Sequence, residues 1–445
     1  IILTLIIIIA LAVVLQAREV SLTVYNQNLA LVHEYRDIDL ESGTFTYSFT
    51  DIPDRIIPTS VHFLSEGVEI LEQNYEFDLA SVDKIHQKFI GETIRAYTAD
   101  GSLFEGRLQP SGSQALILVG NEGRVLVINL DEIVHVEFPR MPENFVEQPT
   151  LIWTLDSRRS GSRQAEVSYL TEGMNWHAEY VAVVDEKLSF NGWVSIENRS
   201  GVEYRDAKLK LMAGDIHRAP QKVRRDMWEA ADMGMGAGAP AFEEKAFFEY
   251  HLYTLQRPST LKNNQVKQIS LFPEKSVDYR RNYVYDPRLD NDNVVVMLVF
   301  RNSKKAGLGM PLPAGTVRVY QQDDDGTQEF IGEDRIKHTP ADEEVNVRVG
   351  SAFDIKVERT VVARRQISQF VQEEEVKFSI RNHKKEAVEI EVKDYLHGNW
   401  RILNSSHEYE KIDAYTIKFT VDVPAHKSGE ETVITYTARY GRYNQ

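Results

Sequence analysis

Apolar and polar residues alternate with a period of two along most of the chain. In 44–50, three aromatic side chains alternate with hydroxyl residues. The same alternation recurs at 345–349, 353–357, 376–380, 388–392 and 415–423. This period puts apolar side chains on one face of a strand and polar ones on the other, as in antiparallel sheets, whereas the continuous apolar run 294–300 predicts a strand covered on both faces. Since no long stretch has a helical period, we predict an all-β protein of antiparallel β-sandwich modules with one or two short helices.

Five short predicted strands lie close together in the first third of the chain. They are 89–97, 103–109, 114–119, 124–130 and 133–138. Five short strands with tight turns cannot bury one face of a flat sheet, so we predict that residues 83–140 curl into a small SH3/Sm-like barrel. Many such barrels bind RNA, but this segment holds six Lys or Arg and eight Asp or Glu with no basic stripe, which argues against nucleic acid.

Composition and turn signals divide the whole chain into five segments. The predicted segments are a signal peptide or anchor (1–17), an N-terminal β module (18–82), the small barrel (83–140), a β-sandwich region (141–345) with a disordered loop (226–246), and a C-terminal β-sandwich module (346–445). The loop is assigned because 232–241 is rich in Gly and Ala.

The first 17 residues carry no charge and hold 15 apolar side chains. This run is short for a membrane span, which needs roughly 20 residues, and it fits the apolar core of a secretory signal. A retained anchor and a buried strand are the alternatives. We therefore expect an exported protein of the periplasm or cell envelope, in contact with a membrane only through 1–17 if this segment is not cleaved.

Three alternating runs end on an asparagine. These runs are 195–198, 299–302 and 379–382. Asparagine at a strand end can adopt the left-handed conformation and bond its own backbone, so shared turn chemistry explains the similarity. The alternative is that two or three sandwich modules of similar build follow one another.

Charge and composition exclude several classes of function. The chain has 51 Lys or Arg against 67 Asp or Glu, a formal charge of −16, which is unsuited to general nucleic-acid binding. With no cysteine, disulfides, thiolate zinc sites and cysteine nucleophiles are impossible. The twelve histidines are scattered, and the acidic turns at 290–293 and 323–326 lack the spacing of a calcium loop; the second is predicted to be a hairpin tip. We predict no catalytic residue, cofactor or metal.

The segment 174–180 is the most varied in chemistry. Trp176, His177 and Tyr180 are the candidate binding residues, because aromatic side chains beside a histidine can line a ligand groove. The alternative is that Trp176, Ala178 and Tyr180 share one face of a strand and pack in a sandwich.

The run 166–180 resembles the opening of a bacterial domain of unknown function, which forms the C-terminal part of mucoidy-inhibitor-A-like proteins. The segments 197–215, 250–253 and 267–272 resemble its later parts, so the resemblance covers roughly 165–440, and 24–32 resembles the N-terminal strand module of such proteins. Those proteins carry a coiled-coil insertion where this chain has the small barrel. The resemblance implies a β-rich envelope protein and supplies no catalytic residues.

From these observations we expect an exported, non-enzymatic β-sandwich protein of the bacterial cell envelope with a structural role or a protein or envelope polymer as its partner. One alternative is a hydrolase of an envelope glycan or peptide, which needs two carboxylates about 5–10 Å apart in a cleft. Another is a carbohydrate-binding module with coplanar exposed aromatic residues, for which Trp176, Trp193 and Trp400 are the test.

Overall fold

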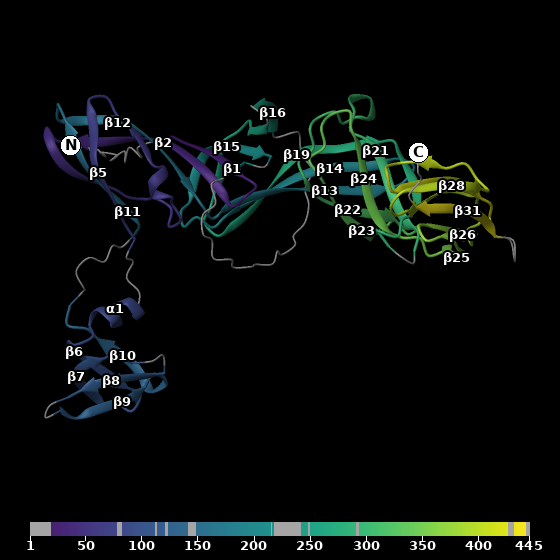
Figure 1. The fold of residues 1–445 in the computed structure, drawn as a ribbon. Helices are drawn as coiled ribbons and strands as arrows, with labels where there is room; N and C mark the ends of the chain where they lie inside the picture. Colours follow the sequence, from purple (N-terminus) through teal and green to yellow (C-terminus); the bar gives the residue numbers. More distant parts are fainter. Residues whose placement is uncertain are drawn as a thin grey trace, which may run out of the picture.

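The computed structural model describes residues 19–77, 82–111, 114–120, 123–140, 148–214, 216–217, 242–247, 250–290, 293–425 and 431–441. These residues form sheets almost throughout, so the predicted all-β class is confirmed (Figure 1). The helical elements among them are short: α1 (Val82–Lys88), η1 (Pro58–Ser60), η3 (Leu130–Glu132) and η4 (Lys304–Ala306). None of the helices in this part of the chain is long and apolar enough to cross a membrane. The predicted signal peptide or anchor, 1–17, lies outside the described residues.

The first sandwich packs an eight-stranded sheet on a three-stranded one. The larger sheet has the order β16-β17-β15-β1-β2-β12-β4, with β18 paired to β15, and the smaller has the order β3-β11-β5. The strands of the larger sheet are β1 (Glu19–Tyr25), β2 (Leu29–Leu40), β4 (His62–Leu64), β12 (Gly161–Thr171), β15 (Tyr204–Ala213), β16 (Phe242–Phe247), β17 (Tyr250–Leu255) and β18 (Ser259–Leu261). Those of the smaller sheet are β3 (Gly43–Phe49), β5 (Val68–Glu76) and β11 (Thr150–Ser157). The layers meet at the buried Trp153, whose ring centroid lies 5.0 Å from that of Phe63.

Strands from distant parts of the sequence complete this first sandwich. β1 and β2, from the segment predicted as an N-terminal module, pair with β15 and β12 of the following region, and β1 runs parallel to β15. Their buried residues belong to one hydrophobic core. Residues 242–246, which the sequence assigned to a disordered loop, instead form most of β16, because they pair along their length with β17. The rest of that predicted loop, 226–241, lies outside the described residues.

Two further sandwiches share one six-stranded sheet. The sheets that face it have the orders β19-β14-β13-β22-β23 and β25-β26-β31-β28, and the shared sheet has the order β24-β21-β20-β27-β30-β29. The first facing sheet contains β13 (Met174–Val184), β14 (Leu188–Asn198), β19 (Gln265–Val277), β22 (Gly315–Gln322) and β23 (Gln328–Ile336). The second contains β25 (Ile355–Ser368), β26 (Val371–Asn382), β28 (Trp400–Ser405) and β31 (Thr432–Gly441). The shared sheet contains β20 (Tyr279–Tyr285), β21 (Val295–Arg301), β24 (Glu344–Ser351), β27 (Val388–Tyr395), β29 (Glu410–Lys411) and β30 (Thr416–Val423).

The shared sheet contributes to two separate hydrophobic cores. Phe300 of β21 packs in the first core, with its ring centroid 5.1 Å from that of Phe190. Phe419 of β30 packs in the second, 5.8 Å from the ring of Tyr436. Leu298 and its neighbour Val299 are both buried, as predicted for a strand covered on both faces. The two sandwiches are therefore joined through a common layer.

Within 83–140, a five-stranded sheet has its own small core and lies apart from the rest in Figure 1. Its order is β10-β6-β7-β8-β9, with β6 (Thr93–Thr98), β7 (Leu103–Gln109), β8 (Ala115–Val119), β9 (Val125–Asn129) and β10 (Ile133–Glu137). The last four predicted strands agree within one residue at each end. The first begins too early in the prediction, because Phe89 lies in the turn after α1 and fills the core. In the described residues β9 and β10 do not pair, so the sheet is open rather than a closed barrel.

The three asparagine-ended runs place their asparagine in the same structural corner. Each side chain is buried, its Nδ2 donates to three backbone carbonyls, and its Oδ1 accepts a backbone N–H just downstream. Asn382, for example, donates to Glu386, Val423 and Pro424 at 2.8, 3.2 and 3.2 Å. Because two of the three carbonyls come from a segment distant in sequence, local turn chemistry alone does not explain the similarity, and the repeated-module interpretation is favoured.

Candidate functional site

The three predicted binding residues lie on β13 but do not come together. Trp176 and Tyr180 point into the sandwich, where the Trp176 indole donates to the Met212 carbonyl at 3.2 Å and the Tyr180 hydroxyl donates to the Pro313 carbonyl at 2.7 Å. His177 points to the opposite, exposed face. Successive residues of a strand point to opposite faces, so these three side chains cannot line one groove. Trp176 and Tyr180 have the packing role that was the alternative.

On the exposed face, His177 belongs to a polar network around Glu179. The carboxylate of Glu179 accepts hydrogen bonds from Gln268 at 2.9 Å and Ser195 at 3.3 Å, and its other oxygen lies 3.3 Å from His177 Nε2. The hydrogen bond from His177, with the positive charges of His177 and Arg318, holds the pKa of Glu179 below its ordinary 4.5 despite partial burial. The Glu179 carboxylate lies between Ser195 and His177. In a catalytic triad the histidine lies between the serine and the carboxylate and takes the proton of the serine, so this arrangement is not a triad.

The other tryptophans do not form an aromatic platform with Trp176. Trp193 and Trp400 are half-buried on different sheets, and their indole N–H groups donate to Asn191 Oδ1 at 3.1 Å and the Ala414 carbonyl at 2.7 Å. In the described part of the chain, no three metal-ligating side chains gather in one place.

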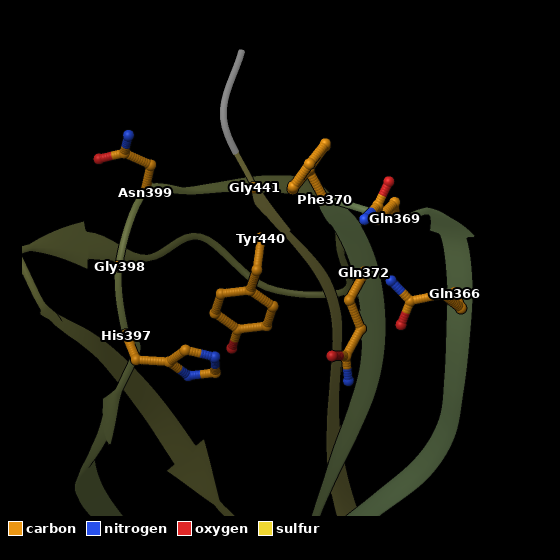
Figure 2. Close-up of a pocket in the computed structure, with 9 residues that line it drawn as sticks. All are labelled: Gln366, Gln369, Phe370, Gln372, His397, Gly398, Asn399, Tyr440 and Gly441. Carbon is orange, nitrogen blue, oxygen red and sulfur yellow. The ribbon is translucent and has the colours of Figure 1, made fainter.

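A concave site lies at one end of the β25-β26-β31-β28 sheet and has a volume of about 500 Å³. We call it the amide pocket. Figure 2 shows His397 and Tyr440 close together on one side of it and Gln366 and Gln372 across from them. It is lined by Gln366, Gln369, Phe370, Gln372, His397, Gly398, Asn399, Tyr440 and Gly441. The lining thus combines four side-chain amides with aromatic rings and contains no Asp, Glu, Lys or Arg.

Strand pairing brings these distant residues together. The β25–β26 hairpin turns at 369–370, and its second strand pairs with β31 so that Gln372 lies opposite Tyr440. Gly441 closes the arrangement: its N–H donates to the Asn399 carbonyl at 3.0 Å. A Cβ at Gly441 would come within 2.5 Å of the Phe370 carbonyl, so only glycine permits this approach.

The Tyr440 ring forms the floor of the pocket. It is 7% exposed and stacks on His397 with 4.2 Å between centroids and 10° between planes. Burial, and then the negative charges of Glu374 and Asp394, raise the pKa of Tyr440. Its hydroxyl therefore stays protonated at neutral pH, able to donate and to accept a hydrogen bond.

A family model matches a large part of the chain. The family described as domain of unknown function (DUF4139) matches residues 165–396, more than half of the sequence. The chain belongs to the DUF4139 family. No curated protein matches the chain. This membership confirms the coarser part of the sequence resemblance, a bacterial domain of unknown function.

The DUF4139 match begins in β12 and ends at the first residue after β27. It therefore includes the hairpin side of the amide pocket, with Gln366 and Gln372, but not His397 or Tyr440 on the other side. The pocket is completed by strands that follow the DUF4139 match in the sequence.

Beneath the amide pocket lies a buried charged cluster. Asp394, near the end of the DUF4139 match, is 3% exposed and accepts from Arg359 Nε at 2.9 Å, from the Tyr436 hydroxyl at 2.5 Å and from the Tyr395 N–H at 2.8 Å. Each carboxylate oxygen is bonded, so the cluster fixes the strands below Tyr440 rather than offering a free acid.

Sequence reasoning missed this pocket. One signal was present: 366–372 holds three glutamines and Phe370 within seven residues. The partner residues follow at 397–399 and 440–441, and no local pattern connects them.

Proposed function

We propose that this protein is an exported, non-enzymatic binding protein of the bacterial cell envelope, and that its amide pocket binds a neutral glycan. The observation that carries the proposal is the lining itself: four side-chain amides and aromatic rings, with no Asp, Glu, Lys or Arg. Such a lining selects for a ligand rich in hydroxyl or acetamido groups and low in charge.

The chemistry of amides supports a sugar ligand. Each Gln or Asn side chain offers a carbonyl acceptor and two N–H donors, which suit neighbouring hydroxyls or an acetamido group. The exposed Phe370 ring supplies an apolar face for the C–H side of a sugar ring. Gln366 is already held in place, since its Nε2 donates to the Ser368 carbonyl at 2.6 Å.

The absence of carboxylates from this lining supports binding rather than hydrolysis. A glycosidase would need two carboxylates on either side of the scissile bond. Asp394, the buried acid below Tyr440, is bonded to Arg359 and Tyr436 instead. We therefore rank the hydrolase as the weaker proposal.

The small sheet supports the finer part of the family proposal. We propose that it is a partly open SH3/Sm-like barrel, with β9 and β10 as its unpaired edges, and that it replaces the coiled coil of mucoidy-inhibitor-A-like proteins. Its last strand, β10, pairs with its first, β6, and pairing of the first and last strands is typical of a sheet that curls toward a barrel. We propose no nucleic-acid partner for it, since Arg95 is paired with Glu105 and Glu137, and Arg140 with Glu92.

A protein partner is the second candidate, favoured by one edge. β25 is the outer strand of its sheet, and Val362, Ile367 and Phe370 on it and its turn are 54%, 53% and 69% exposed. An exposed strand edge can accept a strand from another chain. This edge leads into the amide pocket at Phe370.

The direct test is titration of the chain with two neutral probes, a tetramer of N-acetylglucosamine and a tetramer of glucose. We expect saturable binding of at least one, and a loss of roughly tenfold or more in the Gln369→Ala/Phe370→Ala double variant, since a hydrogen bond and an apolar contact are removed. The matched control is Gln328→Ala/Phe330→Ala, which removes the same exposed pair from β23.

Binding of neither tetramer would overturn the glycan proposal, and so would an equal loss in both double variants. Cell fractionation tests the compartment separately. Recovery of the full-length protein in the cytoplasm, with no partner in pull-downs from envelope extracts, would overturn the envelope proposal.

A further inference from the structure

A second concave site lies where the two hydrophobic cores of the shared sheet separate. It has a volume of about 230 Å³, and we call it the seam pocket. Leu298, on its wall, belongs to the first core, whereas Tyr283 belongs to the second. All its lining residues fall between 184 and 384, inside the family match.

The gap follows from the way one sheet serves two sandwiches. β20 and β21 are packed on one part by the sheet containing Phe190 and on another by the sheet containing Phe378. Between these layers, Val184, Val349 and Leu298 leave apolar walls that no side chain fills. A gap with apolar walls favours an apolar ligand over water.

The charges around the seam pocket are all of one sign. Arg281 and Lys384 line it, and no Asp or Glu does. Lys384 Nζ lies 5.4 Å from the centroid of the Tyr283 ring. Neither cation forms an ion pair with a carboxylate in the described part of the chain, whereas Arg280, next in sequence on the other face of β20, is paired with Glu344 at 2.6 Å.

Arg281 and Lys384 thus line this gap without a carboxylate partner among the described residues, in a chain of formal charge −16. Arg280 and Arg381, in contrast, are paired with the acids Glu344 and Glu431. An anion recognised at this place would supply the missing negative charge, and its apolar part would fill the gap.

We infer that the seam pocket binds a small monocarboxylate with an apolar body, such as an acyl carboxylate. Its carboxylate would lie between Arg281 and Lys384, and its chain would lie along Leu298 and Val349. The space equals about eight water molecules at about 30 Å³ each, which suits an acyl chain of about six to eight carbons. The inference is independent of glycan binding at the amide pocket.

Calorimetric titration with octanoate tests this inference, with 1-octanol as the uncharged comparison. We expect octanoate to bind at least about tenfold more tightly than octanol, because charge-assisted hydrogen bonds hold only the acid. The Arg281→Gln/Lys384→Gln double variant is expected to lose at least about tenfold in octanoate affinity. Arg280→Gln/Lys385→Gln, which changes the neighbouring exposed cations, should stay within about twofold.

Three results would overturn the inference: no saturable binding of octanoate, equal binding of octanol, or an equal loss in the two double variants. Thermal unfolding of each variant shows that it is folded. A Leu298→Trp variant, which fills the gap while keeping both cations, adds an independent measurement. If it binds octanoate as well as the unaltered chain does, the ligand lies elsewhere and the inference fails.

Discussion

The amide pocket and the seam pocket both border the C-terminal sandwich, yet their linings have opposite chemistry. The first is lined by side-chain amides and aromatic rings, with Gln366, Gln372 and Asn399 around Tyr440. The second has apolar walls, such as Leu298 and Val349, and two cations, Arg281 and Lys384, in its lining. The difference follows from position: strand ends and turns carry polar side chains, whereas a gap between two sandwiches is walled by their core residues.

This comparison shows that one sheet arrangement yields two kinds of site. The amide pocket depends on the close approach of neighbouring strands and turns, as the contact of Gly441 with Phe370 illustrates. The seam pocket depends on the separation of the two hydrophobic cores that share one sheet. Variants that disturb the residues supporting one pocket and leave those of the other unchanged should therefore alter ligand binding at one site only.

The largest effect is expected for Arg359→Met. The change leaves the buried Asp394 carboxylate without its cation, which destabilises folded proteins by about 3–5 kcal/mol. Denaturant unfolding measures the loss, and glycan binding should weaken because Tyr440 lies over this cluster. Arg365→Met, an exposed change on the same strand, should cost about 0.5 kcal/mol or less. A loss below about 1 kcal/mol for Arg359→Met would contradict the assigned role.

An intermediate effect is expected for Asn382→Ala, which removes three carbonyl contacts and the bond from the Lys384 N–H at 3.0 Å. We expect a loss of about 2–3 kcal/mol from buried groups left unpaired. Octanoate binding should also weaken, because the Lys384 backbone N–H loses its hydrogen bond to Asn382 Oδ1, which holds Lys384 in position. Asn302→Ala removes the same kind of corner away from both pockets, so it should cost similar stability and leave octanoate affinity unchanged. Unequal losses of stability would argue against equivalent corners.

The smallest effect is expected for Glu179→Gln, on a face remote from both pockets. A partly exposed network of this kind contributes about 1 kcal/mol or less at neutral pH. The folded pKa of Glu179 lies below its ordinary 4.5, so its contribution is present above pH 4.5 and is lost as the pH falls through the folded value. Unfolding curves at several pH values should show the variant and the unaltered chain converging in acid. A gap that persists or widens there would refute this.

Much of the strand content could be predicted because alternation records which face is covered. The β9 and β10 strands, for example, agree with prediction within a residue at each end. Partners could not be predicted, because a period of two does not say which strand lies alongside. The parallel pairs β1–β15, β13–β22 and β20–β27 join distant segments and leave no local mark.

The sites were harder to predict for the same reason. Trp176 and His177 are adjacent in sequence but lie on opposite faces of β13, so composition suggested a groove that strand geometry forbids. Gln372 and Tyr440 are far apart in sequence but lie opposite each other across β26 and β31. The asparagine corners could be predicted only in part. The asparagine that ends each alternating run is visible in the sequence, but two of its three hydrogen-bond partners lie far away in the sequence.

The parallel pairing of β1 with β15 has a consequence for the order of folding. Ser21 pairs with Lys208, so the first described strand lacks one neighbour until a segment near the middle of the chain has been synthesised. At about 5–20 residues per second, that interval is on the order of ten seconds or more. Until then the nascent chain holds an incomplete sheet with an open edge, for which aggregation competes with folding and a chaperone would be the natural protector.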